Sequence, residues 1–139
     1  MRRLHVSILI SLFLTGFAIS SAYGAGDDED WILFSSNVTG DRFYYTEQSI
    51  VLGQGKTAKV VQKVMSGQAD SDIREVATVV EFDCPKLMYR RLKTATLSRS
   101  GDIRNVMEPV QWNSITPGSP TDILSQKVCA RVKVRGRER

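Results

Sequence analysis

Two cysteines carry the clearest chemistry in this 139-residue sequence. Cys84 and Cys129 lie far apart along the chain, and they could be joined in a disulfide or stay as two buried free thiols. On the chain-entropy model, closing a loop of about 45 residues stabilises a fold by about 4 kcal/mol. The choice between the two states depends on the compartment, because disulfides persist mainly in exported proteins.

The N-terminal segment indicates export. Arg2 and Arg3 precede an apolar run over residues 4–19, and small residues follow at Ser20, Ser21, Ala22 and Gly24. This order is typical of a secretory signal peptide, and the apolar run is shorter than the roughly 20 residues of a membrane span. We therefore expect cleavage of residues 1–24 and, in the oxidising compartment beyond, a disulfide between Cys84 and Cys129. No cysteine ends the signal region, so we expect no lipid anchor and no transmembrane segment in the mature chain.

Removal of the signal peptide also narrows the chemistry. Removing 24 of the 139 residues leaves 115, and losing Arg2 and Arg3 lowers the formal charge from +4 to +2. His5, the only histidine, is lost as well. Without an imidazole there is no Ser–His catalysis and no histidine metal site, so we expect neither an enzyme nor a bound metal ion or cofactor. The remaining length suits a single domain over residues 25–139.

Opposite charges gather at the two ends of this mature chain. Residues 25–30 form an acidic lead-in with four consecutive carboxylates, and basic side chains recur from Lys127 into a basic tail over 131–139. We interpret both as solvated segments. The alternative for the tail is contact with an anionic envelope polymer, a phospholipid head group or a host glycosaminoglycan. Export argues against nucleic acid as a partner.

Short runs of β-branched and aromatic residues follow from Trp31, separated by turn formers, which is typical of an antiparallel sheet. We expect strands over residues 31–38, 42–46, 57–65, 74–84, 87–97 and 103–112. The last should lie at an edge, because Pro109 interrupts it. Alternation within 74–84 turns the even positions, which include Cys84, toward the core, and the odd positions, such as Glu81 and Asp83, mostly toward water.

One helix is expected after these strands. Ser119 can cap it, Pro120 suits its first position, and Asp122 stands three residues after the cap. Within residues 120–132, Leu124 and Val128 form an apolar stripe flanked by Ile123 and Ala130. A disulfide from Cys129 to Cys84 would hold this helix against the core face of the sheet.

Three further motifs carry weaker signals. Residues 53–57 read Gly-Gln-Gly-Lys-Thr, but a phosphate-binding loop needs a glycine where Ile50 stands, so a hairpin turn is the better interpretation. Asn37 begins an Asn-Val-Thr glycosylation sequence that matters only in eukaryotic secretion. Alternation also forces one member of the Tyr44–Tyr45 pair outward, and an outward Tyr44 would belong to an exposed or dimer surface.

The order of these features resembles the surface-adhesin protein E family of Gram-negative bacteria. Trp31 opens the first strand, an aromatic strand leads into Ile50, and Cys84 ends a central strand. The most specific part precedes the Cys129 helix and reads Trp112, Asn113, Ser114, Ile115, Thr116, Pro117, Gly118, Ser119.

This resemblance implies a particular α+β fold. It is a six-stranded antiparallel sheet whose concave face is covered by one C-terminal helix, with Cys84 and Cys129 as the disulfide that ties the helix down. The resemblance also assigns a scaffold role to seven residues, namely Trp31, Ile50, Trp112, Ile115, Pro117, Gly118 and Ser119. It identifies no ligand-binding residue, because no adhesive segment matches by motif.

The resemblance further implies a dimeric surface protein that binds host vitronectin, laminin and plasminogen. We therefore expect an exported, non-enzymatic binding protein of the bacterial envelope, either periplasmic or at the cell surface. A homodimer is one oligomeric state that the resemblance implies. The alternative is a periplasmic accessory protein that binds another bacterial protein, for instance by adding a strand to an open sheet edge. The absence of a lipid-anchor cysteine favours that alternative.

Overall fold

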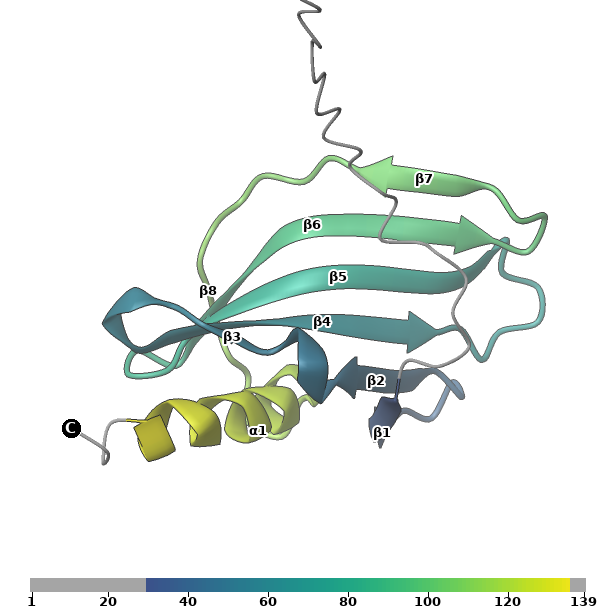
Figure 1. Cartoon of the computed structure of the whole chain (residues 1–139). Coiled ribbons are helices and arrows are strands. Elements are labelled where there is room, and N and C mark those ends of the chain that lie inside the picture. Colours follow the sequence, from purple (N-terminus) through teal and green to yellow (C-terminus); the bar gives the residue numbers. More distant parts are fainter. Residues whose placement is uncertain (1–29, 136–139) are drawn as a thin grey trace, which may run out of the picture.

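The computed structural model describes residues 30–135. The expected signal peptide, the acidic lead-in before Asp30 and the tail beyond Arg135 therefore lie outside the described residues. Within this range the chain forms one antiparallel sheet with a helix packed against it (Figure 1). The expected fold class, including the disulfide between Cys84 and Cys129, is confirmed.

Eight strands make up the sheet. They are β1 (Trp31–Ser36), β2 (Arg42–Thr46), β3 (Val51–Leu52), β4 (Thr57–Met65), β5 (Ile73–Asp83), β6 (Met88–Ser98), β7 (Ile103–Val106) and β8 (Asn113–Ser114). The main path runs β1-β2-β4-β5-β6-β7, with β3 paired to β4 and β8 paired to β6. Two 3-10 turns, η1 (Glu47–Ser49) and η2 (Gln54–Lys56), flank β3, and α1 (Pro120–Arg135) closes the fold.

Several element ends differ from the predictions. β1 stops at Ser36 rather than residue 38, because the Asn37 side chain accepts hydrogen bonds from the backbone N–H groups of Thr39 and Asp41 and so forms a turn. β7 is the expected edge strand, but it ends at Val106 and the chain leaves the sheet before Pro109. The two-residue strands β3 and β8 are too short to show a period of two, so the sequence pattern did not predict them.

The sheet has two faces with different contents. Directly opposed residues of antiparallel strands share a face, and the register places Tyr45, Val60, Val80 and Phe82 on the face that α1 covers. We call this the helix face. The other side, the outer face, carries Trp31, Tyr44, Lys59, Val61, Lys63, Ala77, Val79, Glu81, Arg90 and Lys93.

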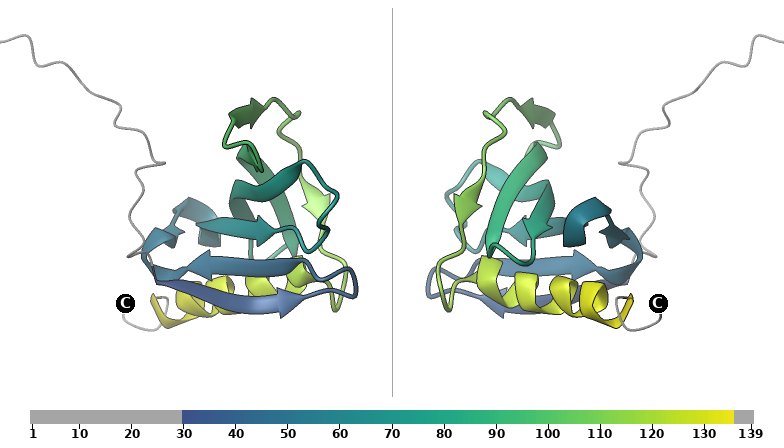
Figure 2. Two further views of the ribbon diagram at one scale, coloured as in Figure 1. Left: turned by 90° about the vertical axis from the view of Figure 1, so that its right-hand side faces the viewer. Right: turned by 90° about the vertical axis from the view of Figure 1, so that its left-hand side faces the viewer.

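The apolar core lies between the helix face and α1. Val60, Phe82, Leu124 and Val128 are all fully buried there, which confirms the stripe expected from the four-residue spacing of Leu124 and Val128. Ala130, the expected flank of that stripe, is instead exposed. In Figures 1 and 2, α1 runs beneath the β1, β2 and β4 part of the sheet, and β7 lies farthest from it.

The start of α1 follows the predicted capping pattern with one change. The Ser119 side chain accepts a hydrogen bond from the Asp122 N–H at 3.2 Å, as expected of an N-cap. The Asp122 carboxylate reaches past the cap and accepts from the Gly118 N–H at 2.9 Å. The helix also runs on to Arg135 instead of ending near residue 132, so Arg131, Lys133 and Arg135 of the expected tail are helical.

Candidate binding surface

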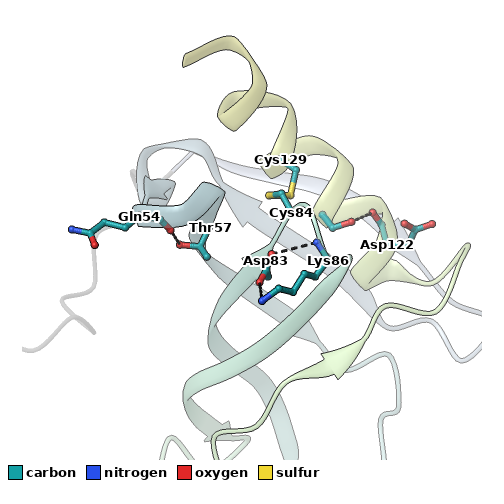
Figure 3. Close-up of a disulfide and its surroundings, with 8 residues drawn as sticks. Gln54, Thr57, Asp83, Cys84, Lys86, Asp122 and Cys129 are labelled. Atoms are coloured by element: carbon teal, nitrogen blue, oxygen red, sulfur yellow. Dashed lines mark hydrogen bonds and ion pairs between the residues drawn. A yellow bond between two sulfur atoms is a disulfide. The ribbon is translucent and has the colours of Figure 1, made fainter. Parts of the chain in front are cut away.

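The disulfide joins the end of β5 to α1. Cys84 directly follows Asp83, the last residue of β5, and its sulfur bonds to that of Cys129 at 2.03 Å with the two Cα atoms 5.7 Å apart (Figure 3). Both half-cystines pack against the apolar core. No free cysteine remains in the chain, so the pair is a crosslink between sheet and helix and not a reactive thiol centre.

The segment from Trp112 to Ser119 carries the chain from the far edge of the sheet to the helix. Asn113 and Ser114 pair with Tyr89 and Met88 as β8. Ile115 then donates its N–H to the Leu87 carbonyl at 3.2 Å and packs against the core. Gly118 has a φ of +76°, a conformation that a side chain disfavours. Residues 112–119 therefore form the connection that leads into α1, and their scaffold role stays a prediction.

A charged stack occupies the outer face beneath that connection. The Arg90 Nε donates to the Glu81 carboxylate at 2.6 Å, and the guanidinium lies 4.5 Å from the centre of the Trp112 ring. Glu81 is only 6% exposed. The expectation that Glu81 faces water is therefore wrong: Glu81 is buried and paired with Arg90, whose guanidinium lies over Trp112, on a face that alternation alone assigns to solvent.

A second stack lies at the opposite end of the outer face. The Lys63 ammonium is 4.0 Å from the centre of the Trp31 ring and 5.9 Å from that of Tyr44. Tyr44 is half-buried, whereas its neighbour Tyr45 is buried in the core. Burial raises the pKa of the Tyr45 phenol. Cation–aromatic contacts of this kind stabilise by about 0.5–1 kcal/mol at exposed sites.

Ile50, the other scaffold residue from the resemblance, lies on the helix side. It follows η1, donates its N–H to the Glu47 carbonyl at 3.1 Å, and packs against the core cluster. Glu47 in turn forms an exposed ion pair with Arg131 of α1 at 2.7 Å. The scaffold residues therefore lie on both sides of the sheet, and the structure does not bring them together into one site.

Three loops meet at the end of the sheet away from the disulfide. The Asp41 carboxylate of the β1–β2 loop accepts from the Gly67 N–H of the β4–β5 loop at 2.9 Å, and the Asn37 amide donates to the same carboxylate at 3.0 Å. These hydrogen bonds lower the pKa of Asp41. Gly67 is also required sterically, because a Cβ there would lie 2.3 Å from the backbone carbon of Gly40.

Arg99 of the β6–β7 loop braces the same region. Its guanidinium donates to the carbonyls of Ser71 and Gln68 at 2.7 and 2.6 Å, and its backbone N–H donates to the Asp72 carbonyl at 2.8 Å. We call the joined loops 37–41, 66–72 and 98–102 the loop end. It is a surface whose backbone is fixed by hydrogen bonds, with Val38 fully exposed on it.

The Gly-Gln-Gly-Lys-Thr segment forms the turn between β3 and β4, as its interpretation as a hairpin predicted. Strand β4 follows it, and not the helix that a phosphate-binding loop requires. With Val132 and Arg135 of α1, the turn lines an open groove of about 600 Å³. Gly55 and Lys56 both have a φ of +64° there. No carboxylate belongs to the described lining of this groove.

Within residues 30–135, no three His, Cys, Asp or Glu side chains gather closely enough to hold a metal ion. In the same described range, no helix is both long and apolar enough to cross a membrane.

Sequence reasoning identified the disulfide and the helix start, but it missed the partners of the surface residues. Arg90, Lys63 and Arg99 each make a specific contact that was not predicted. The pair of Glu81 and Arg90 could have been predicted from the sequence, because the two residues are equally far from the centre of the turn that joins β5 and β6 and therefore lie opposite each other. The contacts of Lys63 and Arg99 depend on strand order and on loop packing, for which the sequence holds no local signal.

Comparison with known proteins agrees with this architecture. The model of a family described as Surface-adhesin protein E matches residues 31–130. A crystal form of Haemophilus influenzae protein E is similar in structure with a TM-score of 0.58 and 16% identity, covering 74% of this chain and 89% of that one. Protein E from non-typeable Haemophilus influenzae also has a TM-score of 0.58, with 14% identity over 80% of this chain and 82% of that one. No curated protein sequence matches the chain.

Proposed function

The chain belongs to the surface-adhesin protein E family, and from this premise we propose that it is an exported, non-enzymatic binding protein whose partner is a protein of the host matrix or serum. The observation that carries the proposal is the family match over residues 31–130, which spans the sheet, the disulfide and most of α1. A homodimer and a location in the periplasm or at the cell surface are parts of the same proposal. Sedimentation of the purified protein tests the homodimer.

A binding role is supported by what the described residues lack as well as by what they hold. The chain has no histidine after His5, and both cysteines are used in the crosslink. The short ion pairs are structural, since Arg90 holds Glu81 within the sheet and Arg131 holds Glu47 against α1. None of these groups is placed with the nucleophile and base geometry of covalent catalysis.

We place the protein contact at the loop end. Its backbone is already fixed by the hydrogen bonds of Asp41 and Arg99, so binding costs little further loss of conformational freedom. Val38 projects there as a fully exposed apolar side chain. Loops held on a rigid sheet are also where binding residues commonly lie.

The direct test is binding of the purified protein to immobilised vitronectin and laminin. We expect saturable binding at micromolar concentration, and we expect Val38→Glu to weaken it at least about tenfold, the loss of about 1.4 kcal/mol. Leu87→Glu is the matched control, because Leu87 is also an exposed apolar residue, 66% accessible, in the turn at the other end of the sheet. Absence of saturable binding would contradict the adhesin proposal, and equal losses in both variants would contradict the loop end.

An open sheet edge supports a second candidate function, that of a periplasmic accessory protein. β7 is the last strand of the sheet path, with β6 on one side and no strand on the other in the described chain, and Ile103 on it is 51% exposed. A partner strand could pair with this edge. Protease treatment of intact cells separates the two candidates, because a surface protein is digested and a periplasmic protein is protected.

A further inference from the structure

We propose that the outer face binds an anionic polysaccharide, a ligand class separate from the protein partner proposed above. Its basis is a set of three lysines on this face, Lys59, Lys63 and Lys93. The acidic groups on the same face form no ion pair with these lysines among the described residues. Glu81, directly opposite Lys59, is held by Arg90, and Asp83 is paired with Lys86. Glu75 lies diagonally next to Lys63, one row beyond Ala77.

The three lysines are spread like the corners of a triangle. Lys59 and Lys63 are four residues apart on β4, which is about 13 Å along a strand. Lys93 is two strands away, in the row of Val61 and Val79, at about 10 Å across the sheet. None of the three has a carboxylate within 4.0 Å among the described residues. A ligand that carries several spaced negative charges therefore complements this face.

Aromatic rings border the same area. Trp31 and Tyr44 lie on one side beneath the Lys63 ammonium, and Trp112 lies on the other side over Arg90. Trp112 is 36% exposed, and Trp31 and Tyr44 are half-buried, so each offers part of a ring to a ligand. The C–H faces of sugar rings pack well on aromatic rings. Cations between aromatic groups therefore suit a charged sugar chain.

The shape of the sheet favours a flexible polymer over an anionic membrane. Figure 2 shows that the strands turn strongly from β1 and β2 to β6, so the outer face is twisted. A flexible linear polysaccharide adapts to a twisted face more easily than a planar bilayer does. It can run along β4 past Lys63 and Lys59, or cross the sheet from β4 to Lys93 on β6.

Heparin serves as the polysaccharide probe, with the purified protein and titration calorimetry at low and physiological salt. We expect saturable binding that weakens as salt rises, as cation–polyanion contacts do. The double variant Lys59→Gln/Lys93→Gln should lower the affinity at least about tenfold. The matched control is Lys127→Gln/Lys133→Gln, because both residues are exposed on α1 and the charge change is the same. This control should change the affinity less than about twofold.

Three outcomes would overturn the proposal. The first is no heparin binding at low salt, and the second is an equal loss of affinity in the two double variants. The third is binding to anionic phospholipid vesicles or to DNA that is as tight as heparin binding and depends equally on Lys59 and Lys93. Binding to vitronectin and laminin is measured with the same variants. Lost heparin binding with intact protein binding supports two separate surfaces, so failure of either proposal is recognised independently of the other.

Discussion

The two faces of this sheet are buried by different means. The helix face meets apolar residues of α1, and its central residues Val60 and Phe82 are completely inaccessible. The outer face is covered in part by charged and aromatic side chains. Arg90 pairs with Glu81 and lies over Trp112, and Lys63 lies over Trp31. The helix face therefore holds the fully buried apolar core, and the outer face carries charged side chains, such as Lys59 and Lys93, that are exposed.

The largest difference between the faces should appear on truncating an aromatic ring from each. Phe82→Ala leaves a cavity beneath α1 and should lower the free energy of unfolding by about 4 kcal/mol. Trp112→Ala on the outer face should cost about 1–2 kcal/mol, because its ring is 36% exposed and mainly covers Arg90. Urea denaturation measures both, and equal costs would contradict the difference between the faces.

The disulfide acts on the helix face alone. The Cys84→Ser/Cys129→Ser variant should lose about 3 kcal/mol, somewhat below the chain-entropy value, because a reduced chain keeps some residual structure. Thermal unfolding of the oxidised protein, the reduced protein and the variant measures this loss. An unchanged midpoint, or two alkylatable thiols in the exported protein, would show that the crosslink does not hold α1 to the sheet.

On the outer face, the sharpest test removes the cation from its stack. Arg90→Met leaves the nearly buried Glu81 carboxylate without its partner and should cost about 2 kcal/mol, less than for a fully buried pair because Arg90 is partly exposed. Arg91→Met is the matched control, because its pair with Glu108 is long, at 3.8 Å, and exposed. It should cost less than about 0.5 kcal/mol. A double-mutant cycle with Glu81→Gln isolates the pair.

The smallest predicted effect lies outside both faces, at the loop end. The pKa of Asp41 is lowered by the Asn37 and Gly67 hydrogen bonds, so its stabilising contribution is complete above about pH 4 and is lost as the pH falls through the folded-state pKa. The melting temperature of Asp41→Asn should lie below that of the wild type at pH 6 and approach it near pH 2.5. Amide exchange of the Gly67 N–H should show the same trend. A constant difference across this range would contradict the assignment.

The fold was predictable where the pattern is local. The long strands β4, β5 and β6 have clear alternation, and Ser119 and Asp122 mark the helix start by hydrogen bonds within a few residues. The contact of Arg90 with Trp112 was not predictable in this way, because Trp112 follows about twenty residues later, just before the chain returns to pair with β6 as β8. The candidate surfaces depend on contacts between residues far apart in the sequence. Their residues could therefore be named from the sequence, but their arrangement could not be predicted from it.

The disulfide also bears on when this fold can form. Phe82 and Val60 pack against Leu124 and Val128, and Cys84 is paired with Cys129. The core in the middle of the chain is therefore complete only when the C-terminal helix has been added. In a chain that crosses a membrane from its N-terminus, the apolar sheet face would stay uncovered until residue 129 emerges. Because long-range contacts form slowly, the apolar sheet face is most exposed in the interval before α1 packs on it and the disulfide forms.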